Sequence, residues 1–135
     1  MTKPVSLDAA LAIALESGLD EGTAALIDAA SEPHGMQPDR IAAGAVIVDV
    51  RRAMAWDAAS DMIAGARRGD PASTDWHAML PRGMPVVVYC VFGHRVSRAT
   101  ALKLRGAGID AWFLRGGIEA WRAAGRALEA RRGES

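Results

Sequence analysis

A single cysteine begins a short loop that contains a glycine, Cys90-Val91-Phe92-Gly93-His94-Arg95. Cys90 ends an apolar run and a helical pattern begins at Val96, so the loop joins a strand to a helix N-terminus. Such a loop turns several backbone N–H groups inward and forms a nest that favours an anion. Gly93 permits the left-handed backbone conformation that a tight turn needs. A thiol at the base of this nest is expected to become a nucleophilic thiolate at neutral pH.

The side chains around this loop suit an anionic substrate. Arg95 and His94 would supply positive charge and hydrogen-bond donors, and the backbone of Val91, Phe92 and Gly93 would complete the binding site. The alternative for Cys90 is an inert thiol buried at a strand end, which is common for a lone cysteine. The Cys-x-x-Gly-x-Arg pattern between strand and helix favours the reactive interpretation.

Three apolar runs predict the strands that position this loop. Residues 45–50, 85–90 and 111–114 are rich in β-branched or aromatic side chains and show little alternation, which is typical of strands buried on both faces. Residues 96–105 predict a helix that ends at the glycines of 106–108. Strand, helix and strand in this order form a βαβ unit, so the sequence predicts an α/β fold with a parallel sheet and helices on both faces. Ligands then bind outside the carboxyl ends of the strands.

Shorter elements are expected elsewhere. Ser6 and Gly18 bracket one amphipathic helix, and residues 21–30 predict a second, with Ala25, Leu26 and Ala29 on one side. Residues 31–38 contain two prolines and a glycine and are predicted to form a loop rather than a domain boundary. Most of residues 53–82 is interpreted as a surface connection, with a short helix over 75–80.

The composition of the chain argues against several classes of protein. The chain has 135 residues, enough for one core, with 16 basic and 16 acidic side chains. This balance argues against a nucleic-acid-binding protein and against a disordered chain. One cysteine excludes an internal disulfide and a multi-cysteine zinc site. The sequence has no candidate membrane span and no clear secretory signal, so a cytoplasmic location is expected.

Structural or surface roles are expected for other residues whose types often take part in catalysis or metal binding. His34 and His77 lack metal-ligand spacing, so no metal and no cofactor are implied. Solvated positions are predicted for five arginines, and core or lid packing for the four tryptophans: Arg52, Arg67, Arg68, Arg131, Arg132, and Trp56, Trp76, Trp112, Trp121. For Asp49 and Arg51, at the end of the first strong strand, a structural ion pair is one interpretation and a functional role the other.

Four ordered segments of the chain resemble the rhodanese-like sulfurtransferase family. They are a signature strand, a small-residue segment, the strand and loop that present the catalytic cysteine, and a closing glycine-pair and tryptophan motif: residues 46–51, 63–66, 86–95 and 114–121. The resemblance covers about residues 41–121. The loop over 89–97 is most similar to rhodanese domains found with chromate-resistance proteins. The expected organisation is an N-terminal helical extension over 1–40, packed on a rhodanese-like domain over 41–135.

The resemblance implies a persulfide mechanism. The Cys90 thiolate would take the outer sulfur of a donor such as thiosulfate, and cyanide, a thiol or a partner protein would remove it. Arg95 would contact the anion, and Asp49 and Arg51 would help to fix the active-site loop. In relatives a serine often follows the position of Arg95; here Val96 does, and Ser97 comes one place later. The expected partners are a small anionic donor and a thiol or protein acceptor, without nucleic acid or membrane.

Two other functions remain open at this point. Phosphatases and arsenate reductases of the same fold place arginine six residues after cysteine, whereas Arg95 follows Cys90 by five. The shorter loop suits a sulfur atom better than a phosphoryl group, and no aspartate is clearly placed as a general acid. A non-catalytic sensing or interaction module is the other alternative, because a fold does not prove a function. Retention of the cysteine favours an enzyme or a sulfur carrier.

Overall fold

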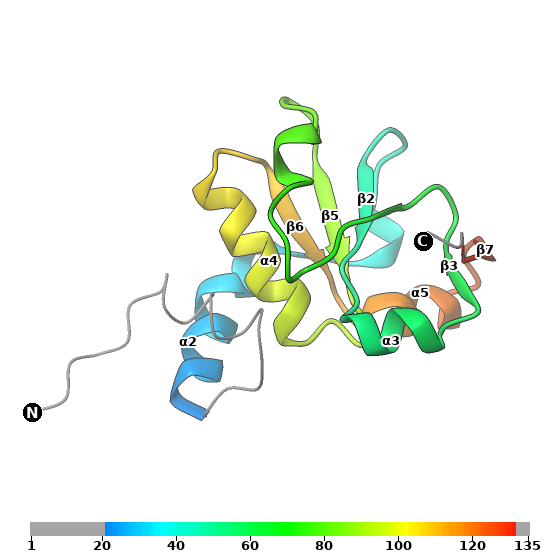
Figure 1. Cartoon of the computed structure of the whole chain (residues 1–135), viewed down its shortest axis with the longest axis horizontal. Coiled ribbons are helices and arrows are strands. Elements are labelled where there is room, and N and C mark those ends of the chain that lie inside the picture. The colour runs from blue at the N-terminus through cyan, green and yellow to red at the C-terminus, as the bar shows by residue number, and fades with distance from the viewer. Residues whose placement is uncertain (1–20, 132–135) are drawn as a thin grey trace, which may run out of the picture.

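The computed structural model describes residues 21–131 of the chain (Figure 1). Its centre is a parallel five-stranded sheet in the order β1-β6-β5-β2-β4. The strands are β1 (Gly35–Met36), β2 (Val46–Asp49), β4 (Arg67–Arg68), β5 (Val86–Tyr89) and β6 (Ala111–Leu114). A second, antiparallel pair joins β3 (Asp61–Ile63) to β7 (Leu128–Ala130). The three predicted strands, and the α/β class with its parallel sheet, are therefore confirmed.

The described residues form four α-helices, three of which pack on the sheet. They are α2 (Glu21–Ser31), α3 (Ala53–Ala58), α4 (Arg95–Gly106) and α5 (Gly117–Ala123). Short 3₁₀ turns are η1 (Glu32–His34), η2 (Pro38–Arg40) and η3 (His77–Met79). The helices predicted over 21–30 and 96–105 are present with nearly those bounds. The helix predicted between Ser6 and Gly18 lies outside the described residues.

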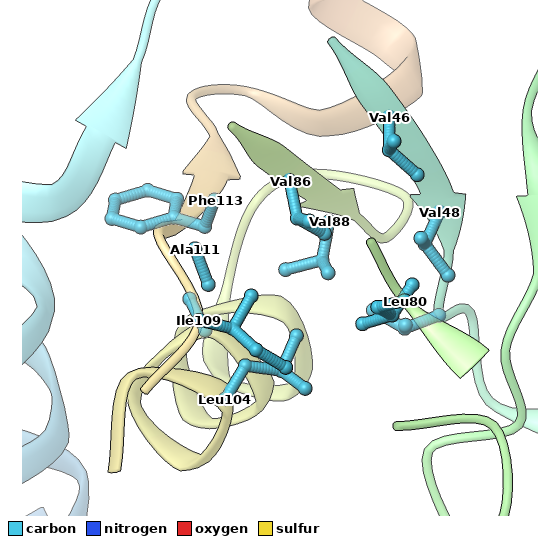
Figure 2. Close-up of a cluster of buried hydrophobic side chains, with 11 residues drawn as sticks. Val46, Val48, Leu80, Val86, Val88, Leu104, Ile109, Ala111 and Phe113 are labelled. Carbon is cyan, nitrogen blue, oxygen red and sulfur yellow. The ribbon is translucent and has the colours of Figure 1, made fainter. Parts of the chain in front are cut away.

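One face of the sheet packs against α4. Val86 and Val88 of β5 point to this face together with alternate residues of β2 and β6, as Figure 2 shows. Leu104 of α4 and the following Ile109 fill the space beneath them. Leu80, from the segment before β5, closes the same cluster. This period-two alternation explains why strands with continuous apolar runs supply side chains to two cores.

The opposite face is covered by α5, α3 and the β3-β7 pair. Val87 and Tyr89 of β5 pack there against Ile118 and Trp121 of α5 and against Trp56 of α3. Helices thus lie on both faces, as predicted. Trp56 and Trp121 are core residues, which confirms the packing role expected for them.

Helix α2 lies beside α4 rather than on the sheet (Figure 1). Its buried positions include Ala24, Ile27 and Ser31, whereas Ala25, Leu26 and Ala29 are exposed. The three residues that the sequence pattern placed on one side of this helix therefore share its exposed face. Alanine is common on both sides of α2, and the buried Ile27 is matched in size by the exposed Leu26, so side-chain size does not distinguish the packed face.

Two segments expected to be irregular contain regular structure. Gly35–Met36, in the predicted loop, pairs with β6 as an edge strand. The predicted surface connection contains α3, β3 and β4 and contributes Met62 and Ile63 to the core. These elements are two to six residues long, too short to produce a readable period. The predicted helix over 75–80 is reduced to the 3₁₀ turn η3.

No helix within residues 21–131 is long and apolar enough to cross a membrane. The division of the chain into an extension over 1–40 and a domain over 41–135 stays a prediction.

Candidate active site

The loop that carries Cys90 follows β5 directly. β5 ends at Tyr89 and α4 begins at Arg95, so residues 90–94 connect the carboxyl end of a central strand to a helix. This is the strand–loop–helix arrangement predicted from the sequence. Cys90 is 5% exposed and packs in an apolar cluster with Ile27, Val96 and Ala99. The inward orientation of the loop N–H groups stays a prediction.

Gly93 is required by both its conformation and its surroundings. Its φ is +75°, in the left-handed region that favours glycine. A Cβ at this position would lie 2.7 Å from the Gly116 nitrogen and 2.8 Å from the Leu114 oxygen. At Gly93 the backbone of the loop therefore packs directly against the turn between β6 and α5, with no side chain between them.

The glycine pair of the closing motif holds the loop from the other side. Ile118 N–H donates to the Cys90 carbonyl at 3.0 Å, and Glu119 N–H donates to the Val91 carbonyl at 3.1 Å. These two donors belong to the first turn of α5, where backbone N–H groups have no partner within the helix. Gly117, with φ of +62°, permits this approach. The closing motif is thus physically coupled to the cysteine loop, and each of the two hydrogen bonds joins residues 28 positions apart in the chain.

Ser97 places a polar side chain within hydrogen-bond distance of the cysteine. Its Oγ lies 3.2 Å from Cys90 Sγ, and either atom can be the donor. Ser97 is fully buried in the first turn of α4. The sequence left its role open, because serine is displaced by one position from its usual place in relatives. The helical turn nonetheless brings the hydroxyl to the sulfur.

Asp49 and Arg51 form a buried ion pair at the end of β2. Arg51 Nη2 donates to Asp49 Oδ2 at 2.6 Å, and the Arg51 backbone N–H donates to Asp49 Oδ1 at 3.0 Å. Tyr89 O–H, from β5, donates to the same carboxylate at 2.7 Å. Burial and the adjacent Asp49 carboxylate raise the pKa of Tyr89 far above its ordinary value. The pair thereby fastens β2 to the residue that immediately precedes Cys90.

Sequence reasoning missed three members of this network: Tyr89, Arg68 and Asp61. The Tyr89 hydroxyl oxygen also accepts a hydrogen bond from the Ile63 N–H, and Arg51 donates to the Asp61 carbonyl at 2.8 Å, so β3 is held as well. Arg68 was predicted to be solvated, but it donates to the backbone carbonyls of Asp49 and Arg51. Its guanidinium stacks over Trp56, as does that of Arg131, which donates to the Ala59 carbonyl. The surface prediction is therefore wrong for Arg68 and Arg131, and no sequence spacing indicated either contact.

A cavity of about 220 Å³ opens beside the loop. Its walls combine the loop residues with three basic side chains and one acidic one: Phe92, Gly93, His94, Arg95, Arg98, Phe113, Arg115, Gly116 and Asp28. Phe92 is 60% exposed and meets the His94 ring edge to face. Four of the five predicted binding residues thus line one cavity. Val91 lies instead on a separate hollow, with Arg51, Asp61, Glu119 and Arg122.

The arginines of the cavity already have acidic partners. Arg95 Nη2 lies 3.1 Å from Asp28 Oδ2 of α2. Glu32 of η1 binds both Arg98, at 3.2 Å, and Arg115, at 2.8 Å. The hydrogen bond from Arg115, followed by that from Arg98, lowers the pKa of Glu32, so its carboxylate is charged at neutral pH. Neither acidic partner was singled out from the sequence.

Within residues 21–131, no group of three or more histidine, cysteine or acidic side chains is arranged to hold a metal ion.

Comparisons with known proteins show which family this chain is similar to. The rhodanese-like domain profile matches residues 36–124. No curated protein sequence matches this chain. A rhodanese-related protein from Thermoplasma volcanium superposes with a TM-score of 0.60 at 19% identity, over 71% of this chain and 97% of that one.

Two further solved structures share the fold. A protein of unknown function from Rhodopseudomonas palustris, described as a possible tyrosine phosphatase, has a TM-score of 0.60 at 18% identity, over 96% of this chain and 98% of that one. Thiosulfate sulfurtransferase from Pseudomonas aeruginosa has a TM-score of 0.59 at 20% identity, over 70% of this chain but 19% of its own. These similarities show the fold, and the profile match covers well over half of the sequence. The chain belongs to the rhodanese-like domain family.

Proposed function

We propose that the protein is a sulfurtransferase that carries a sulfane sulfur on Cys90. The observation that carries this proposal is the position of the thiol: Cys90 follows β5, and its Sγ lies 3.2 Å from the Ser97 hydroxyl. The loop around it is held by two N–H groups of α5. A reactive cysteine needs a fixed position and a donor for its charged form, and both are present here.

The reaction proceeds in two displacements. The Cys90 thiolate attacks the outer sulfur of thiosulfate, so that a Cys90 S–S bond forms, the S–S bond of thiosulfate breaks, and sulfite leaves with the electron pair. The product is a Cys90 persulfide anion. An acceptor such as cyanide then attacks the terminal sulfur, forms thiocyanate and returns the Cys90 thiolate. Charge and sulfur balance in each step, so no external oxidant or reductant is needed.

Each neighbouring group has a defined part in this scheme. Ser97 O–H donates to the thiolate, which has no hydrogen of its own and can only accept. The backbone N–H groups of Val91 to Arg95 receive the negative charge of the persulfide, and Arg95 and His94 attract the anionic donor. Asp49 and Arg51 act at a distance by holding the ends of β2 and β5 in register.

Intact-protein mass spectrometry tests the proposal directly. Mixing the protein with thiosulfate should add one sulfur atom, and subsequent cyanide should remove it. The chain has one cysteine, so Cys90→Ser should show no gain. A wild-type protein that gains no sulfur from thiosulfate, from a thiosulfonate or from a mercapto-acid donor would refute the sulfurtransferase function and leave a non-catalytic module.

Phosphate ester hydrolysis is the second candidate, because the Rhodopseudomonas palustris relative is described as a possible tyrosine phosphatase. Three arginines at the cavity would suit a phosphate group. The loop length speaks against it, since four residues separate Cys90 from Arg95. Asp28, the acid that lines the cavity, is bound to Arg95 rather than free to protonate a leaving group. Release of product from an aryl phosphate, lost in Cys90→Ser, would support this alternative.

A further inference from the structure

Helix α2 reaches the candidate site although it lies outside the region matched to the family. The family match begins at residue 36, and α2 ends at Ser31. Ile27 of α2 is fully buried in the same apolar cluster as Cys90 and Val96. The side chain that follows it, Asp28, lines the cavity beside the loop. This helix therefore contributes to the site from outside the matched region.

The group that α2 adds is the Asp28 carboxylate, which forms an ion pair with Arg95. Asp28 Oδ2 lies 3.1 Å from Arg95 Nη2, and both side chains are 41% exposed. The pair is therefore open to solvent and to a ligand. Arg95 Nε is buried and has no hydrogen-bond acceptor among the described residues. A buried donor without an acceptor is costly, so the Asp28 contact leaves part of the hydrogen-bonding capacity of the Arg95 guanidinium unused.

The charges around the cavity give a small positive balance. Arg95, Arg98 and Arg115 contribute three positive charges, and Asp28 and Glu32 contribute two negative ones, which leaves one positive charge apart from His94. The Asp28 carboxylate therefore weakens the attraction for any anion in the cavity. The loss is twice as large for a doubly charged anion as for a singly charged one.

We propose that Asp28 is a specificity-determining residue that shifts the preference of this site away from doubly charged sulfur donors and toward singly charged ones. The inference rests on the proposed sulfurtransferase function. Thiosulfate is a dianion, whereas an alkyl thiosulfonate presents the same sulfonyl-bound sulfane sulfur on a monoanion. The Cys90 thiolate takes that sulfur in the same way, and an alkyl sulfinate leaves in place of sulfite.

Coulomb's law sets the size of the expected effect. A carboxylate about 6 to 7 Å from the donor, in a solvated setting, changes affinity by about threefold for each unit of ligand charge. Removing the Asp28 charge should therefore increase the affinity for thiosulfate about ninefold and the affinity for methanethiosulfonate about threefold. The ratio of the KM values for the two donors (the donor ratio), rather than either value alone, reports on the Asp28 charge.

The test compares Asp28→Asn and Asp28→Ser with the wild type in sulfur transfer to cyanide. Both variants should lower the KM for thiosulfate more than that for methanethiosulfonate, with kcat nearly unchanged. Asp39→Asn is the control, because it removes one exposed acidic charge from η2 and should leave the donor ratio as in the wild type. Thermal unfolding of each variant checks that the fold persists. An unchanged donor ratio in both Asp28 variants overturns the proposal.

A binding arm separates this inference from the proposed function. Thiosulfate is titrated into Cys90→Ser and into Cys90→Ser/Asp28→Asn, with the dissociation constant measured by calorimetry or by amide chemical shifts. The second protein should bind about ninefold more tightly. Equal dissociation constants would overturn the role of Asp28 whether or not the wild type transfers sulfur. Tighter binding without any persulfide in the wild type would refute the sulfurtransferase function alone.

Discussion

Gly117 lies directly against the backbone carbonyl of Cys90: a Cβ at position 117 would be 2.5 Å from that oxygen. The next residue, Ile118, donates its N–H to the same carbonyl at 3.0 Å. Two neighbouring positions of α5 thus fix the residue that carries the thiol. The glycine is required here because of what it touches as well as because of its φ of +62°.

Gly117→Ala should therefore destabilise the protein by more than about 2 kcal/mol, since it combines left-handed strain with a backbone clash. Gly125→Ala is a matched control: Gly125 has φ of +71°, but an added Cβ there meets nothing within 4 Å. That variant should lose about 1 kcal/mol from strain alone. Urea unfolding measures both. Equal losses for the two variants would mean that contact with the carbonyls of Val91 and Cys90 does not matter.

Ser97→Ala should slow the reaction of Cys90 with iodoacetamide at neutral pH, and sulfur transfer from thiosulfate, by about tenfold. The reason is the loss of a hydrogen bond to a charged sulfur. Thr100→Val serves as the control, because the Thr100 hydroxyl is also buried in α4 but donates to the Val96 carbonyl. Stopped-flow alkylation gives both rates. A Ser97→Ala rate within about twofold of the Thr100→Val rate would remove Ser97 from the mechanism.

Tyr89 should not ionise in the folded protein near pH 10.0, its ordinary pKa, because burial and the Asp49 carboxylate raise that pKa. Tyr89 is the one tyrosine in the chain, so the tyrosinate absorbance reports on it alone. The folded state retains the proton that the unfolded state loses. Stability from this group is therefore complete below pH 10 and declines above it.

An alkaline titration should show tyrosinate appearing only together with unfolding, as followed by circular dichroism. In Tyr89→Phe the stability should decline less steeply above pH 10 than in the wild type. Tyrosinate that forms near pH 10 while the circular dichroism signal stays native would contradict the buried hydrogen bond to Asp49.

Arg51→Met should lower the free energy of unfolding by about 3–5 kcal/mol, because it leaves the buried Asp49 carboxylate without its main counter-charge. Arg67→Met, at an exposed position in β4, is the control and should change stability by about 0.5 kcal/mol or less. The urea midpoints of the two variants give the comparison. Similar midpoints would show that the Asp49–Arg51 pair adds little to the stability of this end of the sheet.

The parts of the fold that were predictable are those with local signals. The central strands are four residues long with nearly continuous apolar side chains, and α4 is twelve residues long with a glycine-rich end. Such patterns arise because both faces of the strands are buried. β3 and β4, with three and two residues, contain too few positions to form a pattern and are stabilised by partners distant in the chain.

The candidate site divides in the same way. The sequence by itself determined the position of Cys90 at a strand end, the glycine in its loop and the glycine pair that follows, because each depends on residue type and local spacing. Only the tertiary structure decided that Ser97 reaches the sulfur and that Asp28 binds Arg95, 67 residues away along the chain. The Asp28 contact depends on how α2 packs against α4, and an alanine-rich helix carries little information about its packed face. Long-range pairing of charges follows from that packing, which no local pattern records.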